Sequence, residues 1–266
     1  MFKLINTDGV YRLVSDIIPA PHAFSTRIGG ASTLPQTAEM NFGSSIDDPC
    51  VDKNIDIFTS KASLPQKTVR VKQIHSNKIA VFTSKYDISR IDEKGFFKGE
   101  GDGFFTTQED ISLCVRTADC LPIILSSKDG RAVAALHAGW RGSVMRIAEK
   151  AVDIFKDHGI PPCDIYAALG PCIDLCCFEV GNDFVENFSL TPSAHLKDMV
   201  IRQKGGKYFC DLKKLNSLIL EEAGLLKDNI DICDRCTHHD PHLFFSHRLT
   251  SFERGTMGNL VAVKKG

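Results

Sequence analysis

Three residues with metal-binding side chains, His75, Cys120 and His137, each stand at the end of an apolar, strand-like run and lie far apart in the sequence. Two imidazoles and one thiolate suit zinc, and a catalytic zinc takes three protein ligands and leaves one position open for water or substrate. Rigid strands place such ligands accurately when their ends converge. The pattern therefore indicates an enzyme rather than a binding module.

The same three residues also allow interpretations without a metal. His75 and His137 can be hydrogen-bonded core residues, with Cys120 packed as a small apolar side chain. Cys120 can instead be the nucleophile of a hydrolase that uses His137 as its base. Bound zinc would remove the free thiolate that such a hydrolase needs, so metal content separates the two enzymes.

Asp119 directly precedes Cys120 and is a further candidate catalytic residue. Neighbouring residues of an extended strand point to opposite faces, so Asp119 can act as a general base only if the break before Pro122 turns it inward. Otherwise its carboxylate holds a ligating histidine through a hydrogen bond, or it stabilises the turn.

The elements that must position these residues follow from hydrophobic periodicity and turn signals. Strands are predicted at residues 2–5, 10–14, 111–117, 121–125, 131–137, 164–169 and 260–263, and two more are joined by a turn at 76–78 within residues 69–82. Helices are predicted from Ser143, as the N-cap, to Gly159, at 179–188, and at 211–223 between the cap Asp211 and the stop Gly224. Residues 25–50 and 87–103 are predicted to be loops.

Predicted strands and helices are intermixed without strict alternation, which favours an α+β fold with mixed β-sheets flanked by helices. A chain of 266 residues can bury one large core, so residues 1–266 are predicted to form a single compact catalytic domain. The 32 basic and 33 acidic residues leave a net charge of -1, which provides no global field for nucleic acid or an anionic membrane. Small molecules are the expected partners, and the sequence indicates no oligomeric state.

The first residues lack the basic start and long apolar region of a secretory signal. No later stretch approaches the roughly 20 apolar residues of a membrane span. A cytoplasmic location is therefore expected. The ten cysteines are expected to be reduced thiols, metal ligands or buried apolar residues rather than disulfides.

Two sequence motifs are specific enough to indicate a family, namely Ala118-Asp119-Cys120-Leu121-Pro122 and His137-Ala138-Gly139-Trp140-Arg141-Gly142. With residues 23–30, 40–43, 73–75, 170–173 and 245–248, they resemble the bacterial laccase-domain family, also called polyphenol oxidase or peptidoglycan editing factor. The resemblance covers most of the chain in the expected order. Members of that family are regarded as zinc-dependent purine nucleoside phosphorylases with adenosine deaminase activity.

The resemblance implies that His75, Cys120 and His137 bind zinc and that purine nucleosides, methylthioadenosine included, bind beside the metal together with phosphate. Zinc lowers the pKa of a bound water to about 7, which would serve deamination at the purine C6. Phosphorolysis needs phosphate held beneath the sugar and a stabilised departing base, for which cations and backbone N–H groups are suited. Copper is expected as a possible substitute because its intrinsic affinity for nitrogen and sulfur ligands is higher.

Five polar residues in or near the family words are candidate nucleoside or phosphate contacts, namely Arg27, Asn41, Gln73, Arg141 and Arg248. Arg141 is predicted to lie just before a helix, whose free N–H groups and dipole favour an anion. A surface or structural ion pair is the alternative role for each arginine.

Other functions stay open at this point. They are the metal-free Cys/His hydrolase, an amidase that edits cell-wall precursors, a copper-dependent polyphenol oxidase, and a non-enzymatic binding protein. The chain lacks the His-x-His pairs expected of a multicopper cluster. His247 also departs from the family, in which tyrosine commonly precedes the arginine, so substrate preference does not transfer.

The tail contains residues for a rival metal site. Cys233 and Cys236 form a close pair of zinc-ligand type, and three histidines follow at His238, His239 and His242. A structural zinc held by members of this group is therefore an alternative to purely structural roles for them.

Overall fold

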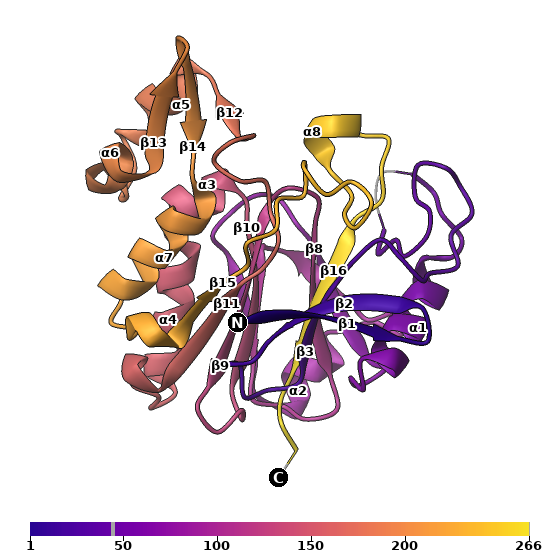
Figure 1. Ribbon diagram of the computed structural model, residues 1–266. Helices are drawn as coiled ribbons and strands as arrows, with labels where there is room; N and C mark the ends of the chain where they lie inside the picture. Colours follow the sequence, from indigo (N-terminus) through magenta and orange to yellow (C-terminus); the bar gives the residue numbers. More distant parts are fainter. Residues whose placement is uncertain (44–45, 266) are drawn as a thin grey trace.

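Three β-sheets organise the described part of the chain, which comprises residues 1–43 and 46–265 of a computed structural model (Figure 1). The seven-stranded sheet contains, in spatial order, β1 (Phe2–Thr7), β2 (Val10–Ser15), β3 (His22–Ser25), β16 (Met257–Ala262), β8 (Ser112–Thr117), β4 (Thr68–Lys72) and β6 (Phe96–Glu100). The six-stranded sheet contains β15 (Ile230–Ile232), β11 (Ile165–Leu169), β9 (Leu121–Ser127), β10 (Val133–Ala138), β7 (Gly103–Thr106) and β5 (Ile79–Phe82). The small third sheet contains β12 (Glu179–Val180), β14 (Lys207–Cys210) and β13 (Ile201–Lys204).

Most strand pairs are antiparallel, but β4 runs parallel to both β6 and β8, β5 runs parallel to β7, and β11 runs parallel to β15. The two larger sheets are therefore mixed, and the predicted α+β class is confirmed. The last strand, β16, pairs with β3 on one side and β8 on the other. Residues from both ends of the chain thus complete one sheet, as Figure 1 shows.

Helices cover the outer faces of the two large sheets. The α-helices of the described residues are α1 (Val51–Lys61), α2 (Lys85–Ser89), α3 (Trp140–Val144), α4 (Ile147–Asp157), α5 (Asn182–Phe188), α6 (Lys197–Val200), α7 (Leu212–Glu222) and α8 (His247–Thr250). In Figure 1, α4 and α7 lie side by side over the six-stranded sheet, whereas α1 lies against the seven-stranded sheet. The centre of the molecule is thus layered as helix, sheet, sheet and helix.

Apolar side chains fill the three spaces between these layers. Phe24, Leu113 and Ile124 belong to the cluster between the two sheets, whereas Phe105 and Phe155 belong to the cluster under α4 and α7. Every residue of β9, β10 and β16 is buried. Strands with both faces covered read as continuous apolar runs, which is why the sequence shows little alternation there.

Several predicted elements are confirmed. The opening hairpin pairs Thr7 with Val10 across the predicted Asp-Gly turn. Asp211 is the N-cap of α7, where its carboxylate accepts a hydrogen bond of 2.9 Å from the Lys214 backbone N–H. Gly224 follows the helix with φ +101°, the left-handed conformation that stops helices.

The prediction that a helix begins at Ser143 is wrong. Gly139 is the N-cap of α3, and α4 begins only after Arg146, whose φ of 58° interrupts the helical path. The buried Ser143 hydroxyl instead donates to the Ala138 carbonyl and accepts from Asn216 of α7. It is therefore used in packing inside α3 rather than as a cap.

Two other expectations need correction. The strands predicted within residues 69–82 exist as β4 and β5, but they belong to different sheets and do not pair with each other. The loop predicted at residues 87–103 contains β6 and part of α2. This short helix starts at a capping box formed by Ser84 and Asp87. Residues 26–43 and 46–50 contain no helix or strand, and residues 44–45 of that predicted loop lie outside the described residues.

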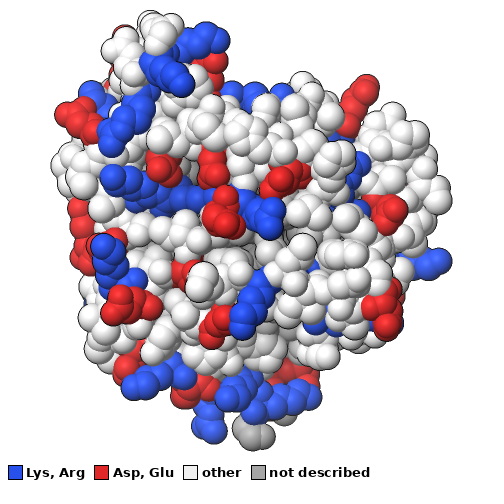
Figure 2. Space-filling model, in the orientation of Figure 1, with Lys and Arg blue, Asp and Glu red and all other residues white. Residues whose placement is uncertain are grey.

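Charged side chains of both signs are intermixed on the face shown in Figure 2, rather than gathered by sign. No helix among the described residues combines the length and apolar character that crossing a bilayer requires.

The buried Asn54 side chain of α1 fastens the long segment that follows β3. Its amide nitrogen donates to the Ser32 hydroxyl and to the carbonyls of Glu39 and Asn41, and its amide oxygen accepts from the Ala31 N–H. This segment continues to Gly43, which lines the cleft of the candidate site. Through Asn54, α1 therefore helps to hold one edge of that cleft in place.

We expect Asn54→Ala to lower the free energy of unfolding by about 1–3 kcal/mol, since it leaves buried partners without hydrogen bonds. Urea denaturation measures the change. Asp56→Ala, at an exposed position of the same helix, is the matched control. Equal stability of the two variants would contradict this role of Asn54.

Candidate metal centre

The structure brings His75, Cys120 and His137 together, with one potential ligand atom of each lying within 4.8 Å of the other two. His75 follows β4 of the seven-stranded sheet, Cys120 lies between β8 and β9, and His137 is in β10. The two imidazole rings meet edge to face, with centroids 4.8 Å apart. His137 is buried and His75 is exposed, so the group reaches from the core to the surface.

Asp102, between β6 and β7, orients both histidines. Its fully buried carboxylate accepts a 2.8 Å hydrogen bond from His137 Nδ1 and bonds from the backbone N–H groups of Ile74, His75 and Ser76, as well as from the Ser76 hydroxyl. Because Nδ1 of His137 donates to a carboxylate, Nε2 is the ring nitrogen that would face a metal ion. Partners of this kind fix the ring orientation of metal-ligating histidines.

The sequence interpretation did not single out Asp102, which lies in a segment predicted to be a loop. Burial alone would raise the pKa of Asp102, but hydrogen bonds from His137 and Ser76 outweigh it and lower the pKa to about 2. The one signal in the sequence is an acidic residue placed between Gly101 and Gly103. That signal is too common to identify a site by itself.

Cys120 and His137 also influence each other's ionisation. Burial opposes the thiolate, but the charge and hydrogen bond of His137 and the hydrogen bond of His75 lower the pKa of Cys120 to about 6. Burial likewise opposes the imidazolium, but the Cys120 sulfur and the Asp102 carboxylate raise the pKa of His137 to about 9. Cys120 is thereby favoured as a thiolate, the form that binds metal ions.

Gly139 keeps the space beside these three donors open. A Cβ atom at this position would lie 2.9 Å from His75 Nδ1 and 3.3 Å from the Cys120 sulfur. The backbone of Gly139 has an ordinary φ of -61°, so space rather than conformation explains glycine here. Together with the two imidazoles and the thiolate, this space fits a metal ion with a position left for a further ligand.

The three donors open into a cleft of about 260 Å³. Its lining residues are Gly43, Gln73, His75, Arg116, Ala118, Cys120, His137, Phe252, Arg254 and Thr256. Neither arginine in this set was a sequence-predicted contact. Arg254 Nε is buried and has no hydrogen-bond partner within the described residues.

Burial lowers the pKa of both cleft arginines from the ordinary value. Near Arg254, the charges of Asp119 and Cys120 act in the opposite direction and favour its charged form. Buried guanidinium groups are costly unless they are paired, so an anion in the cleft would compensate for this cost.

Asp119 does not touch a histidine of the centre. It has φ +88°, which departs from the extended strand that the sequence suggested. Its carboxylate accepts from the Thr237 hydroxyl at 2.6 Å, the Ser246 hydroxyl at 3.1 Å and the Arg248 backbone N–H at 2.6 Å. Asp119 thus fastens the tail of the chain beside Cys120.

Of the five sequence-predicted substrate contacts, the cleft lining includes only Gln73, whose side-chain amide forms two hydrogen bonds of 2.8 Å with the backbone of Arg116. Asn41 is buried, donates to Asp48 and accepts from the N–H groups of Gly43 and Thr256.

The other three predicted contacts are arginines with partners outside the cleft. Arg27 donates to the carbonyls of Ala38 and Pro241 and lies over the Phe245 ring. Exposed Arg141 stacks on Trp140 at 4.4 Å and lies within α3. The Arg248 guanidinium donates to two carbonyls, as described below.

The cysteines of the predicted tail site separate in the structure. Cys236 and His239 join Cys176 and Cys177 in a second group of potential metal ligands, whereas Cys233, His238 and His242 lie outside this group.

A family model described as "Multi-copper polyphenol oxidoreductase laccase" matches residues 21–264. The chain belongs to this family. The family resemblance inferred from the sequence words is thereby confirmed. The description of the family names copper. The candidate metal centre of this chain has one cysteine and two histidines as potential ligands.

Named relatives in the laccase-domain family include two enzymes. Purine nucleoside phosphorylase YlmD of Bacillus subtilis (strain 168) is 30% identical over 250 residues, covering 91% of this chain and 88% of the relative. Adenosine deaminase RL5, from an unknown prokaryotic organism, is 38% identical over 193 residues, covering 70% and 71%. The crystal structure of the Bacillus licheniformis hypothetical protein YfiH matches with a TM-score of 0.86 at 25% identity and covers 99% of both chains.

We expect Asp102→Asn to weaken metal binding about 10–100-fold, because the amide is a poorer acceptor for His137 and for the backbone of the 74–76 turn. Competition with a chelator measures the affinity. Glu100→Gln, at an exposed position that pairs with Lys72, is the matched control. Unchanged affinity in Asp102→Asn would show that this carboxylate does not orient the ligands.

Proposed function

We propose that this protein is a zinc-dependent purine nucleoside phosphorylase that acts on adenosine, inosine and methylthioadenosine and also deaminates adenosine. The observation that carries the proposal is the convergence of His75, Cys120 and His137 at a cleft that also contains Arg116 and Arg254. The names of relatives YlmD and RL5 support the two reactions.

Zinc bound by the three donors would supply Lewis acidity and would lower the pKa of a water in its open position. Asp102 keeps the proton on His137 Nδ1 and holds the His75 turn, so both donors are oriented before any ligand arrives. Such preorganisation reduces the reorganisation needed at the moment of reaction.

Arg116 and Arg254 supply positive charge to the same cleft. Phosphorolysis requires an anion, and charge-assisted hydrogen bonds from guanidinium groups suit phosphate oxygens. The buried Nε of Arg254, which has no hydrogen-bond partner among residues 1–43 and 46–265, makes this residue our first choice for the phosphate contact.

We expect purified, metal-analysed protein to release free base from inosine and methylthioadenosine only when phosphate is present, and to convert adenosine partly to inosine. Separation of the products by chromatography measures both reactions. Cys120→Ala should lose both activities together with the zinc ion of this centre, and Cys163→Ser, at an exposed cysteine outside the cleft, should retain them.

Several outcomes would contradict the proposal. Absence of both products would exclude nucleosides as substrates. Full activity without bound metal would favour the Cys/His hydrolase, and copper-dependent turnover of a phenol alone would favour an oxidase. Hydrolysis of a cell-wall precursor amide alone would favour the editing amidase.

We expect Arg254→Gln to raise KM for phosphate about tenfold or more, since a hydrogen bond to a charged group contributes about 1.5–3 kcal/mol. Initial rates at varied phosphate measure the effect. Arg131→Gln, at an exposed position away from the cleft, is the control. A rise in Arg141→Gln but not in Arg254→Gln would instead favour the contact predicted from the sequence.

A further inference from the structure

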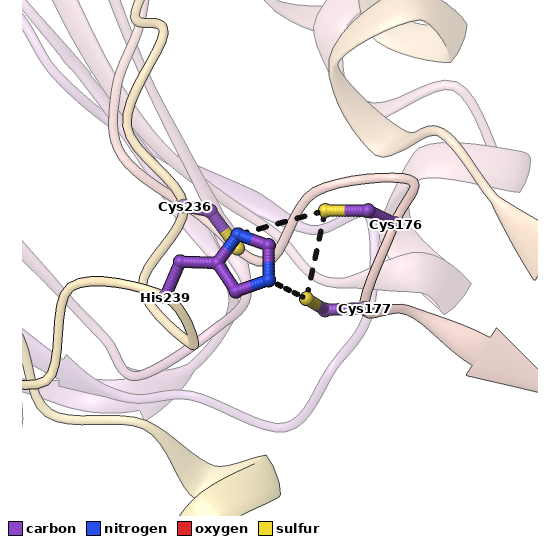
Figure 3. Close-up of side chains that lie close together, drawn as sticks. All are labelled: Cys176, Cys177, Cys236 and His239. Atoms are coloured by element: carbon purple, nitrogen blue, oxygen red, sulfur yellow. Dashed lines mark hydrogen bonds between the residues drawn. The ribbon is translucent and has the colours of Figure 1, made fainter.

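A second group of metal-ligating side chains lies outside the cleft and comprises Cys176, Cys177, Cys236 and His239 (Figure 3). Each residue offers one potential ligand atom, and these four atoms lie within 4.8 Å of one another. Figure 3 shows the sulfurs of Cys176 and Cys177 pointing toward the imidazole of His239. None of these residues lines the cleft of the candidate metal centre.

The donors lie close enough together to surround one zinc ion, with the two neighbouring sulfurs facing different nitrogens of the His239 ring. The two neighbouring sulfurs are 3.5 Å apart, the Cys176 sulfur is 3.8 Å from His239 Nδ1, and the Cys177 sulfur is 3.1 Å from His239 Nε2. With a zinc–sulfur distance of about 2.3 Å, tetrahedral geometry places two sulfur ligands roughly 3.7 Å apart. Rotation of the exposed Cys176 and His239 side chains, so that one imidazole nitrogen faces the sulfurs, would complete the site.

The ligand set is of the structural rather than the catalytic kind. Three thiolates and one imidazole fill all four tetrahedral positions, which is the Cys3His composition of closed zinc sites. Cys236 and His239 also have the short spacing, with two residues between them, that such sites commonly use.

Backbone contacts hold the two contributing segments in place. The isolated bridge between Cys172 and Cys236 joins them, and the Thr237 N–H donates to the Cys172 carbonyl at 3.0 Å. The Asp174 N–H donates to the Cys236 sulfur at 3.4 Å. The donors are thus brought together by the fold and not only by their own side-chain rotations.

We propose that Cys176, Cys177, Cys236 and His239 bind one zinc ion that fastens the 174–178 loop to the tail. Binding replaces the three thiol protons by the metal, and these protons pass to solvent. The exposed side chains of Cys176 and His239 give the ion a path from solvent.

The position of this site explains what the ion would do. Thr237, next to the ligand Cys236, donates to Asp119, which precedes Cys120 of the metal centre. The Arg248 guanidinium donates to the carbonyls of Cys177 and Glu179, while its backbone N–H donates to Asp119. A zinc at the second group would therefore hold in place the tail that packs beside the first.

Oxidation to a disulfide is the main chemical alternative. The adjacent sulfurs of Cys176 and Cys177 are 3.5 Å apart, well beyond the roughly 2.05 Å of a disulfide bond. His239 lies in contact with both sulfurs, and Cys236 completes the group, which a disulfide between neighbours would not require. These contacts favour a shared cation over a redox pair.

The experiment is elemental analysis combined with native mass spectrometry of the full-length protein purified without chelator and with zinc in the medium. We expect two zinc ions per chain in the wild type and in the control Cys163→Ser. The double variant Cys176→Ser/His239→Ala should retain one, and both replaced side chains are exposed, so the core is left intact. Its thermal unfolding midpoint should fall by several degrees relative to the control.

A reciprocal variant distinguishes the loss of one zinc site from general misfolding. Cys120→Ala should lose one zinc and keep the second, whatever happens to enzymatic activity. The proposal is overturned if Cys120→Ala binds no zinc, if the double variant keeps both ions, or if a different metal occupies the second group. A wild-type mass lower by two hydrogen atoms, with one zinc bound, would show the disulfide instead.

Discussion

One buried carboxylate holds the candidate metal centre together. Asp102 receives hydrogen bonds from three successive backbone N–H groups of the 74–76 turn and from the His137 ring. Its own backbone also joins this arrangement, since the Asp102 carbonyl accepts from the His137 N–H at 2.7 Å. Because His75 follows a strand of one sheet and His137 belongs to the other, this residue couples the two sheets at the place where their ligands meet.

The layered arrangement explains why a surface site can be rigid. β10 is buried on both faces, so His137 is presented by a strand that has little freedom to move. His75 lies in a turn with φ +58°, a conformation that costs energy for a side chain other than glycine and is held here by Asp102. Packing of the surrounding core and the hydrogen bonds to Asp102 therefore maintain a strained turn at the candidate metal centre.

Periodicity and capping rules predicted much of the fold because they act within short segments. The opening hairpin, the strands around Cys120 and the helix capped by Asp211 depend on local patterns that the structure confirms. These rules were wrong where packing between distant segments determines the start of a helix or the partner of a strand. Ser143 hydrogen-bonds to Asn216 of another helix, and β4 and β5 pair with strands that are remote from each other.

Residue types and local patterns predicted the donors, their place near strand ends and the family motifs that surround them. Contacts between distant segments determine which charged groups accompany the donors. Asp102 rather than Asp119 contacts His137, Arg254 rather than Arg141 lines the cleft, and Cys236 and His239 meet Cys176 and Cys177 rather than Cys233. The physical reason is that side-chain direction depends on backbone angles such as the φ of +88° at Asp119, and on pairings between segments far apart in the chain.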